Sequence, residues 1–323
     1  MVRRAFIKFR KHFADELVLF AIIATFFIVM TIVSPYFLTT RNLMNILQNV
    51  SLQGITSIGM TMVIIAGGID LSVGAVLALA SWVAAFFIKA GVAWPVAVLV
   101  AFVIAAVFGL LNAISVAVIR IPPMIATLAT QNMARGLQTV ISGGRTLNGF
   151  PESFQVFGQG MIFNAIPVPA LLTVLLFILA SFFMKRTYIG RCIYAVGGNR
   201  EASRIAGINN TRIMFFVFIM SALLSCFAGL IFIARLDSAP AALAKELEMK
   251  AIMGAVIGGT SVTFGGKGKM FGTFLGVVVV GLIINAMDLL GLNAYYQQFV
   301  QGLLVLLAVT LEALRERYAE KRS

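Results

Sequence analysis

Residues 17–34 read LVLFAIIATFFIVMTIVS and include no charged side chain. A transmembrane helix needs about 20 mostly apolar residues to cross the hydrocarbon core of a bilayer. This run is longer than the apolar core of a cleavable signal peptide, and no A-x-A cleavage site follows it. The stretch therefore predicts a first transmembrane helix that is retained in the protein.

Apolar runs of this kind recur along the 323 residues, of which 60% are hydrophobic and 11% charged, with a mean hydropathy of +1.00. Soluble domains have about 25% charged residues, so most of this chain is expected to be surrounded by lipid. The composition predicts an all-α, polytopic membrane protein with one transmembrane domain over residues 1–323. About ten spans, several of them short or broken, are expected near residues 17–34, 48–66, 72–89, 95–119, 123–141, 168–184, 213–234, 249–264, 270–288 and 298–314.

The net charge of +13 and the isoelectric point near 10.3 are explained by this membrane location. Lys and Arg are retained on the cytoplasmic flanks of membrane helices, and no basic and aromatic surface module indicates nucleic-acid binding. With the spans above, most of the 25 Lys and Arg residues fall on the side of the N-terminus. Both termini are therefore expected in the cytoplasm, together with the flank 1–16, the loop 185–212 and the tail 315–323.

Residues suited to catalysis or metal binding are scarce. His12 is the only histidine, and Cys192 and Cys226 are far apart in the sequence without a CxxC motif. No nucleophile with its base and no paired set of carboxylates is apparent in the sequence. The chain is accordingly expected to have no catalytic residues, no metal site and no cofactor of its own.

The sequence GGIDLSVG at 67–74 separates two apolar runs. Gly67 and Gly68 allow the backbone to leave helical geometry. Asp70 and Ser72 are placed to cap the next helix by accepting its free N–H groups, which would make the motif a structural break. An ionisable residue beside membrane spans is costly, so Asp70 is also a candidate for a transport pathway or gate. Broken helices recur in transporters, and the two interpretations are compatible.

The loop 185–212 is longer than a simple connection between two spans requires. Its centre, AVGGNREASRIAGI at 195–208, predicts a short helix that starts near Arg200 and ends at Gly207. Glu201 falls in the first turn of that helix, where a negative charge is favoured by the helix dipole. The extra length indicates a docking element for a cytoplasmic partner, and the alternative is a solvated loop.

A third glycine-rich stretch, GGTSVTFGGKGK at 258–269, superficially resembles a phosphate-binding loop. The P-loop pattern requires Ser or Thr directly after its lysine, but Gly268 follows Lys267. The stretch is therefore interpreted as a tight turn on the cytoplasmic side rather than a nucleotide site.

Several polar side chains fall within or near the expected spans, and interhelical hydrogen bonding is their default role. Gln131 and Arg135 are four positions apart and share a helix face. They could alternatively line the passage of a polar substrate or form an internal ion pair. The complete set of such pathway candidates is Gly67, Gly68, Asp70, Ser72, Gln131, Asn132, Arg135 and Asn285.

Taken together, the stretches at 67–74, 195–202 and 258–269 and the segment LLGLNAYYQQ at 289–298 resemble a known family. They are similar to the permease subunit of bacterial ribose-type monosaccharide ABC importers, and the similarity extends from about Ser34 to the last expected span. Two three-residue stretches depart from the usual pattern of the family, Glu248-Met249-Lys250 and Pro122-Pro123-Met124. Both departures affect the expected identity of the substrate more than the expected fold.

The resemblance implies that the chain is one subunit of a complex in the bacterial cytoplasmic (inner) membrane, whose subunits carry out different steps of transport. A second permease copy would complete the pathway, a cytoplasmic ATPase subunit would hold ATP and Mg²⁺, and an extracytoplasmic sugar-binding protein would deliver the substrate. Residues of the long loop match the family's EAA-x-x-x-G motif, which docks on the ATPase. The docking candidates are Gly198, Asn199, Glu201, Ala202, Ser203 and Gly207.

Two alternative functions remain open from the sequence. Related permeases transport branched-chain amino acids or nucleosides, although the GGIDLSVG string favours a sugar. An ion-coupled secondary transporter would need a buried carboxylate, for which Asp70 and Asp288 are the candidates. That alternative gives the long loop no purpose.

Overall fold

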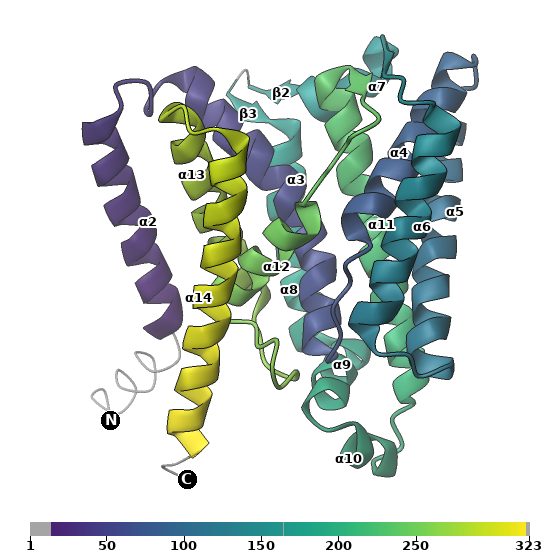
Figure 1. The fold of residues 1–323 in the computed structure, drawn as a ribbon, viewed down its shortest axis with the longest axis vertical. Helices are drawn as coiled ribbons and strands as arrows, with labels where there is room; N and C mark the ends of the chain where they lie inside the picture. The colour runs from purple at the N-terminus through teal and green to yellow at the C-terminus, as the bar shows by residue number, and fades with distance from the viewer. Residues whose placement is uncertain (1–13, 164, 321–323) are drawn as a thin grey trace.

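A computed structural model describes residues 14–163 and 165–320, most of them in helices that run roughly along one direction (Figure 1). The predicted cytoplasmic flank, including His12, lies almost entirely outside the described residues, as do the last three positions of the tail. The helices are α2 (Ala14–Val33), α3 (Thr40–Ile65), α4 (Val73–Lys89), α5 (Trp94–Ala113) with η1 (Ile114–Val118), α6 (Pro123–Ser142), α7 (Glu152–Gln159), α8 (Val168–Arg186), α9 (Tyr188–Gly198), α10 (Arg200–Ile205), α11 (Asn210–Leu236), α12 (Leu247–Ile257), α13 (Met270–Leu289) and α14 (Ala294–Glu320).

Within the described residues, six helical segments are long and apolar enough to cross a membrane. They are α2, α5 with η1, α8, α11, α13 and α14. The prediction of an all-α, polytopic membrane protein is therefore confirmed. The remaining predicted spans correspond to α3, α4, α6 and α12, which are shorter or more polar.

The predicted span at 249–264 is wrong in its extent. α12 has 11 residues and ends at its C-cap, Gly258. At 1.5 Å per residue it is about 16 Å long, roughly half the thickness of the hydrocarbon core. The apolar composition continues past the helix, but Gly259 adopts a left-handed φ of +84°, and a non-helical turn follows it. Figure 1 shows α12 as a short helix at mid-height of the molecule.

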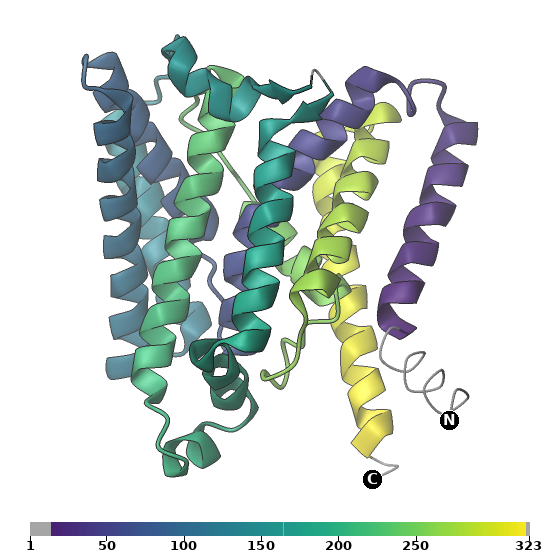
Figure 2. The ribbon, with the colours of Figure 1, turned by 180° about the vertical axis from the view of Figure 1, so that it is seen from behind.

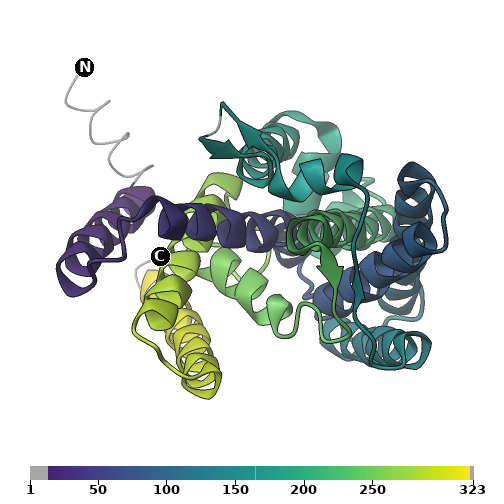
Figure 3. The same cartoon turned by 90° about the horizontal axis from the view of Figure 1, so that it is seen from above.

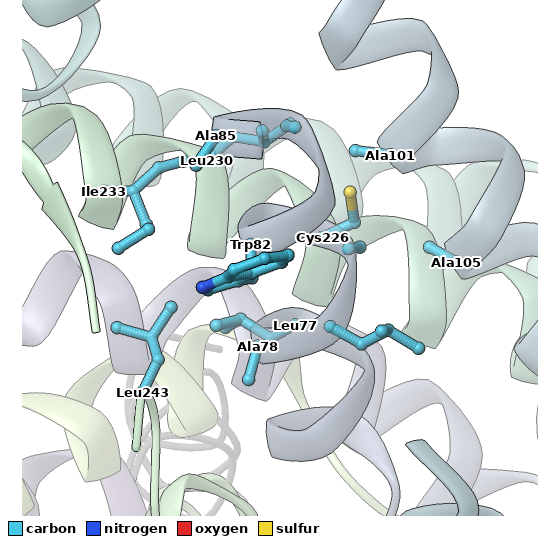
Figure 4. Close-up of a cluster of buried hydrophobic side chains, with 14 of the residues drawn as sticks. Leu77, Ala78, Trp82, Ala85, Ala101, Ala105, Cys226, Leu230, Ile233 and Leu243 are labelled. Atoms are coloured by element: carbon cyan, nitrogen blue, oxygen red, sulfur yellow. The ribbon is translucent and has the colours of Figure 1, made fainter. Parts of the chain in front are cut away.

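The centre of the molecule is formed by α3 and α11, which pack directly against each other. A Cβ at Gly59 would lie only 2.7 Å from Cα of Ser221, so glycine is what allows the two backbones to approach. α4, α5 and α11 surround a core of small and aliphatic side chains around Trp82, which is 4% exposed (Figure 4). Seen from above, α2 lies at one edge of the molecule and α5 at the other (Figure 3).

The two ends of the helical bundle differ in structure. At the upper end, α7 and two short antiparallel strand pairs join the long helices (Figure 1). The pairs are β1 (Leu147–Asn148) with β4 (Ser238–Ala239), and β2 (Met161–Ile162) with β3 (Ile166–Pro167). The lower end holds α9, α10, the start of α2 and the end of α14 (Figures 1 and 2). The predicted loop 185–212 thus lies at the same end as both described chain ends.

Candidate functional site

The break between α3 and α4 occurs at the predicted glycines. Gly67 has a left-handed φ of +83°, its N–H donates to Ile64 O, and the N–H of Gly68 donates to Val63 O. These two bonds satisfy carbonyls that the end of α3 leaves free. The left-handed conformation at position 67 favours glycine. The chain then turns through Asp70, which is completely buried, into α4.

Asp70 lies at the centre of a hydrogen-bond network that joins several helices. Its Oδ1 accepts from Ser72 Oγ at 2.6 Å and from Asn112 Nδ2 at 3.5 Å, while its Oδ2 accepts from Ser221 Oγ at 2.9 Å. Asn112 also donates to Ser72 Oγ at 2.8 Å and accepts from Thr130 Oγ1 at 2.6 Å. The donors to Asp70 come from α5, α11 and the break itself, and Thr130 of α6 is connected to Asp70 through Asn112.

The capping prediction is half right. Asp70 Oδ1 accepts the N–H of Ser72 at 3.0 Å, as a local cap does. Ser72 occupies the N-cap position of α4, but its side chain accepts no helix N–H and instead donates to Asp70, so its predicted capping role is wrong. A cap alone would not need donors from two other helices, and within the described residues no ion pair involves Asp70.

Sequence reasoning did not select Thr130 or Ser221, and it gave Asn112 only the default role of interhelical hydrogen bonding, without placing it among the pathway candidates. Hydroxyl and amide groups are common in membrane helices and bond across many helix pairs, so their presence alone does not indicate a site. Their convergence on Asp70 depends on how α5, α6 and α11 are packed, which no sequence pattern specifies.

The polar face of α6 contacts the segment that leads to α12. Arg135 donates to the carbonyl oxygens of Leu243 and Ala244, at 2.6 and 2.9 Å. Gln131 Nε2 donates to Glu248 Oε1 at 2.9 Å. The two side chains thus share a face as predicted. Arg135 holds the chain before α12 and Gln131 holds the first turn of α12.

The other two polar candidates lie apart from this face. Asn132 is exposed on α6, and its side chain forms no hydrogen bond among residues 14–163 and 165–320. Asn285 forms a reciprocal amide pair with Asn42, with N–O distances of 3.1 and 2.7 Å, that joins α13 to α3. The structure therefore does not bring Asn132 or Asn285 into the Asp70 network.

The short helix predicted in the long loop is confirmed as α10. Asn199 caps its start by accepting the N–H of Ala202 at 2.9 Å, and Gly207 follows its end with a φ of +82°. Glu201 and Arg204 form an exposed ion pair with a 2.6 Å contact. Ile205 is 79% exposed, so α10 presents both charged and apolar side chains at the lower end of the molecule.

Three glycine-rich stretches that are far apart in the sequence meet directly beside this loop. A Cβ at Gly197, near the end of α9, would overlap the carbonyl oxygen of Ile65, the last residue of α3. The N–H of Gly266 donates to that same oxygen at 2.8 Å. The hydroxyl of Tyr194 donates to Gly268 O at 3.0 Å, and burial raises the pKa of this phenol, which keeps the donor protonated. The loop 185–212 therefore contacts α3 two residues before the break at Gly67.

The 258–269 turn also connects to α2 and α14. Lys269 forms an ion pair with Glu16 of α2 at 2.7 Å. Ser261 Oγ donates to Glu312 of α14 at 2.5 Å. The interpretation of this stretch as a tight turn is confirmed, and its position is that of a junction between α2, α3, α9 and α14.

Comparison with known proteins agrees with this arrangement. Residues 42–309 match the family model described as "Branched-chain amino acid transport system / permease component". The chain is 41% identical over 287 residues to the ribose import permease protein RbsC of Bacillus subtilis, covering 88% of each chain. It is 39% identical over 312 residues to RbsC of Escherichia coli, covering 96% of this chain and 95% of the relative. No solved structure matches.

A third relative is the D-allose transport system permease protein AlsC of Escherichia coli, 37% identical over 300 residues, with 90% of this chain and 91% of the relative covered. The family match and these identities extend over nearly the whole membrane domain rather than one motif. Members of the family leave ATP hydrolysis to a separate subunit, in keeping with the lack of catalytic residues in this sequence. This chain therefore belongs to the branched-chain amino acid transport system permease component family, as a multi-pass membrane permease of an ABC importer.

Proposed function

We propose that this permease forms the pathway for ribose or a closely related monosaccharide in the cytoplasmic membrane of a bacterium. The relatives with 38 to 41% identity are named as ribose import permeases, and another is named for D-allose. The observation that carries the mechanism is the backbone contact between the docking loop at Gly197 and the end of α3 at Ile65. It offers a direct route from a cytoplasmic partner to the buried Asp70.

The topology in this proposal has ten spans with both termini in the cytoplasm. To the six long apolar helices it adds α3, α4 and α6, and counts the short α12 as a half-span. α10 lies at the same end as the start of α2 and the end of α14 (Figure 1), which supports a common cytoplasmic side. The concentration of basic residues in the loop 185–212 supports the same assignment.

α10 is proposed as the docking element for the ATPase subunit. The side chains of Glu201, Arg204 and Ile205 are exposed there. A cavity of about 390 Å³ beside α10 is lined by Arg120, Arg200 and Arg204, so this surface is suited to a partner groove with acidic side chains. Three other docking candidates stabilise the conformation of the loop: Asn199 caps α10, Ser203 is buried, and Gly207 ends the helix.

In the proposed mechanism, ATP-driven movement of the partner displaces α9 and α10. The contact between Gly197 and Ile65 passes that displacement to the end of α3, and the network around Asp70 passes it to α4, α5, α6 and α11. The hydrogen bonds from Gln131 and Arg135 to the 243–248 segment would break and be replaced by other hydrogen bonds during the same step. Two copies of the chain would enclose the pathway, and a binding protein would deliver the sugar on the opposite side.

The substrate assignment is tested by uptake into proteoliposomes that contain the permease, its ATPase subunit and its binding protein. Unlabelled ribose or allose is expected to compete with labelled ribose, whereas leucine, valine and adenosine are not. Competition by the amino acids or the nucleoside, with none by the sugars, would contradict the proposal and support the related cargo classes.

A further inference from the structure

A groove lies between α8 and α13 at the lower end of the molecule, on the side that Figure 2 shows. Its volume is about 450 Å³, within the range of ~300–1,000 Å³ that small-molecule sites occupy. Phe177 and Phe274 meet at its floor, with ring centroids 5.2 Å apart. Ile178 and Phe182 form one wall and are 60% and 64% exposed, so this groove opens toward the lipid.

The lower end of the same groove is basic. Lys185 and Arg186, the last two residues of α8, belong to its lining and are exposed. Within the described residues no ion pair involves either cation. Glu16, one helical turn before the Phe20 that contacts Phe271 on the far wall, is already paired with Lys269. The positive charge at the mouth of the groove is therefore not neutralised by a described carboxylate.

We propose that this groove binds an anionic phospholipid, with its phosphate at Lys185 and Arg186 and one acyl chain along Phe177, Ile178 and Phe274. Hydrocarbon chains lose no hydrogen bonds in an aromatic and aliphatic groove, so its apolar walls suit them. Cations at the end of a membrane helix attract anionic headgroups, and basic pockets between helices bind them specifically. A zwitterionic lipid fits the same walls but gains less from the two cations.

This inference needs only the membrane location and is independent of the substrate. It also differs from the docking surface, because neither Lys185 nor Arg186 lines the arginine cavity beside α10. A failed lipid test would leave the transport proposal unchanged, and a failed transport assay would leave this site unchanged.

The test is native mass spectrometry of the purified permease, titrated with phosphatidylglycerol or phosphatidylcholine of the same acyl chains. The unmodified protein is expected to retain phosphatidylglycerol with a preference of about tenfold or more. Lys185→Gln with Arg186→Gln should bring that ratio close to one. Ser181→Trp, which places a large side chain in the groove wall, should reduce retention of both lipids.

The matched control is Arg120→Gln with Arg212→Gln, which removes the same charge at the same end of the molecule but outside the groove. It should keep the preference of the unmodified protein within about twofold, since a groove site depends on position rather than net charge. Lys185→Gln alone, a milder change, should give an intermediate ratio. Equal retention of the two lipids by the unmodified protein, or equal losses in the groove and control variants, would overturn the proposal.

Discussion

Asp70 is a carboxylate held without a cation by four hydrogen bonds, from the Ser72 N–H and from the side chains of Ser72, Asn112 and Ser221. Burial of an ionisable group is expensive, so such residues persist in membrane proteins mainly where a function needs them. The bonds reach α5 and α11 and, through Asn112, Thr130 of α6. Asp70 thus links helices that must move together if these hydrogen bonds are to persist.

The first prediction concerns Asp70→Asn, which keeps the shape of the side chain and removes its charge. The amide cannot accept all of the present hydrogen bonds, so stability should fall by about 1–3 kcal/mol and uptake should drop at least tenfold. Reconstituted uptake and thermal unfolding in detergent measure the two effects. Asp288→Asn is the control, because Asp288 is exposed at the end of α13. Equal uptake by Asp70→Asn and the unmodified protein would remove the central role of this carboxylate.

A second prediction at this scale concerns Glu201→Ala. Exposed ion pairs such as that between Glu201 and Arg204 contribute about 0–1 kcal/mol, so the melting temperature of the permease should hardly change. Co-purification with the ATPase subunit should nevertheless fall several-fold, since the side chain points outward from α10. Lys89→Ala at the opposite end of the molecule serves as the comparison. Undiminished co-purification would show that Glu201 does not contact the partner.

Individual residues were predictable from the sequence where local rules decide them. Gly67, Gly68 and Gly207 were expected at breaks and helix ends, and their conformations agree. The partners of Asp70 were not predictable, because Ser221 reaches it from 151 positions away. For the same reason the contact of Arg135 with the 243–248 segment could be described only as an internal interaction.

At the scale of elements, the junction of α3, α9 and the 258–269 turn connects the loop 185–212 to the helix break. The contact is between backbones, so a displacement of α9 cannot be absorbed by the rotation of a side chain. The sequence predicted each of the three stretches as a distinct feature. Their meeting depends on chain topology, which short motifs do not encode.

The third prediction tests this junction with Gly197→Ala. The added methyl group would overlap the carbonyl oxygen of Ile65, so α9 must move away from α3. ATP hydrolysis by the assembled complex should continue while uptake per ATP falls several-fold. Gly302→Ala in α14 adds the same group into open space, away from the docking candidates, and should have a clearly smaller effect. Equal uptake per ATP in these two variants would contradict transmission through this contact.

The extents of the helices were predicted less well than their existence. α12 is much shorter than expected because its apolar sequence continues into a turn whose glycines adopt left-handed conformations. α7 and the strand pairs at the upper end were missed, since the segment 143–167 is too short and mixed for a span. Hydropathy reports the environment of a segment, whereas backbone geometry decides where a helix ends.

At the scale of the whole molecule, membrane class and family followed from composition and motifs, and both are confirmed. The lower end of the permease holds α9 and α10, and its upper end holds short strands and α7 (Figures 1 and 2). The buried network around Asp70 joins helices between these ends. This arrangement suits a subunit that transmits conformational changes driven by ATP hydrolysis in a separate subunit. An ion-coupled carrier would have no use for α10 or for the basic cavity beside it.

The most direct test of this account compares ribose uptake into proteoliposomes that hold the permease and binding protein with either an active or a hydrolysis-deficient ATPase subunit. Accumulation against a gradient should require ATP and the active subunit, and it should persist when a protonophore collapses the proton gradient. Accumulation that continues with the hydrolysis-deficient subunit, or that stops with the protonophore while ATP is present, would contradict the account.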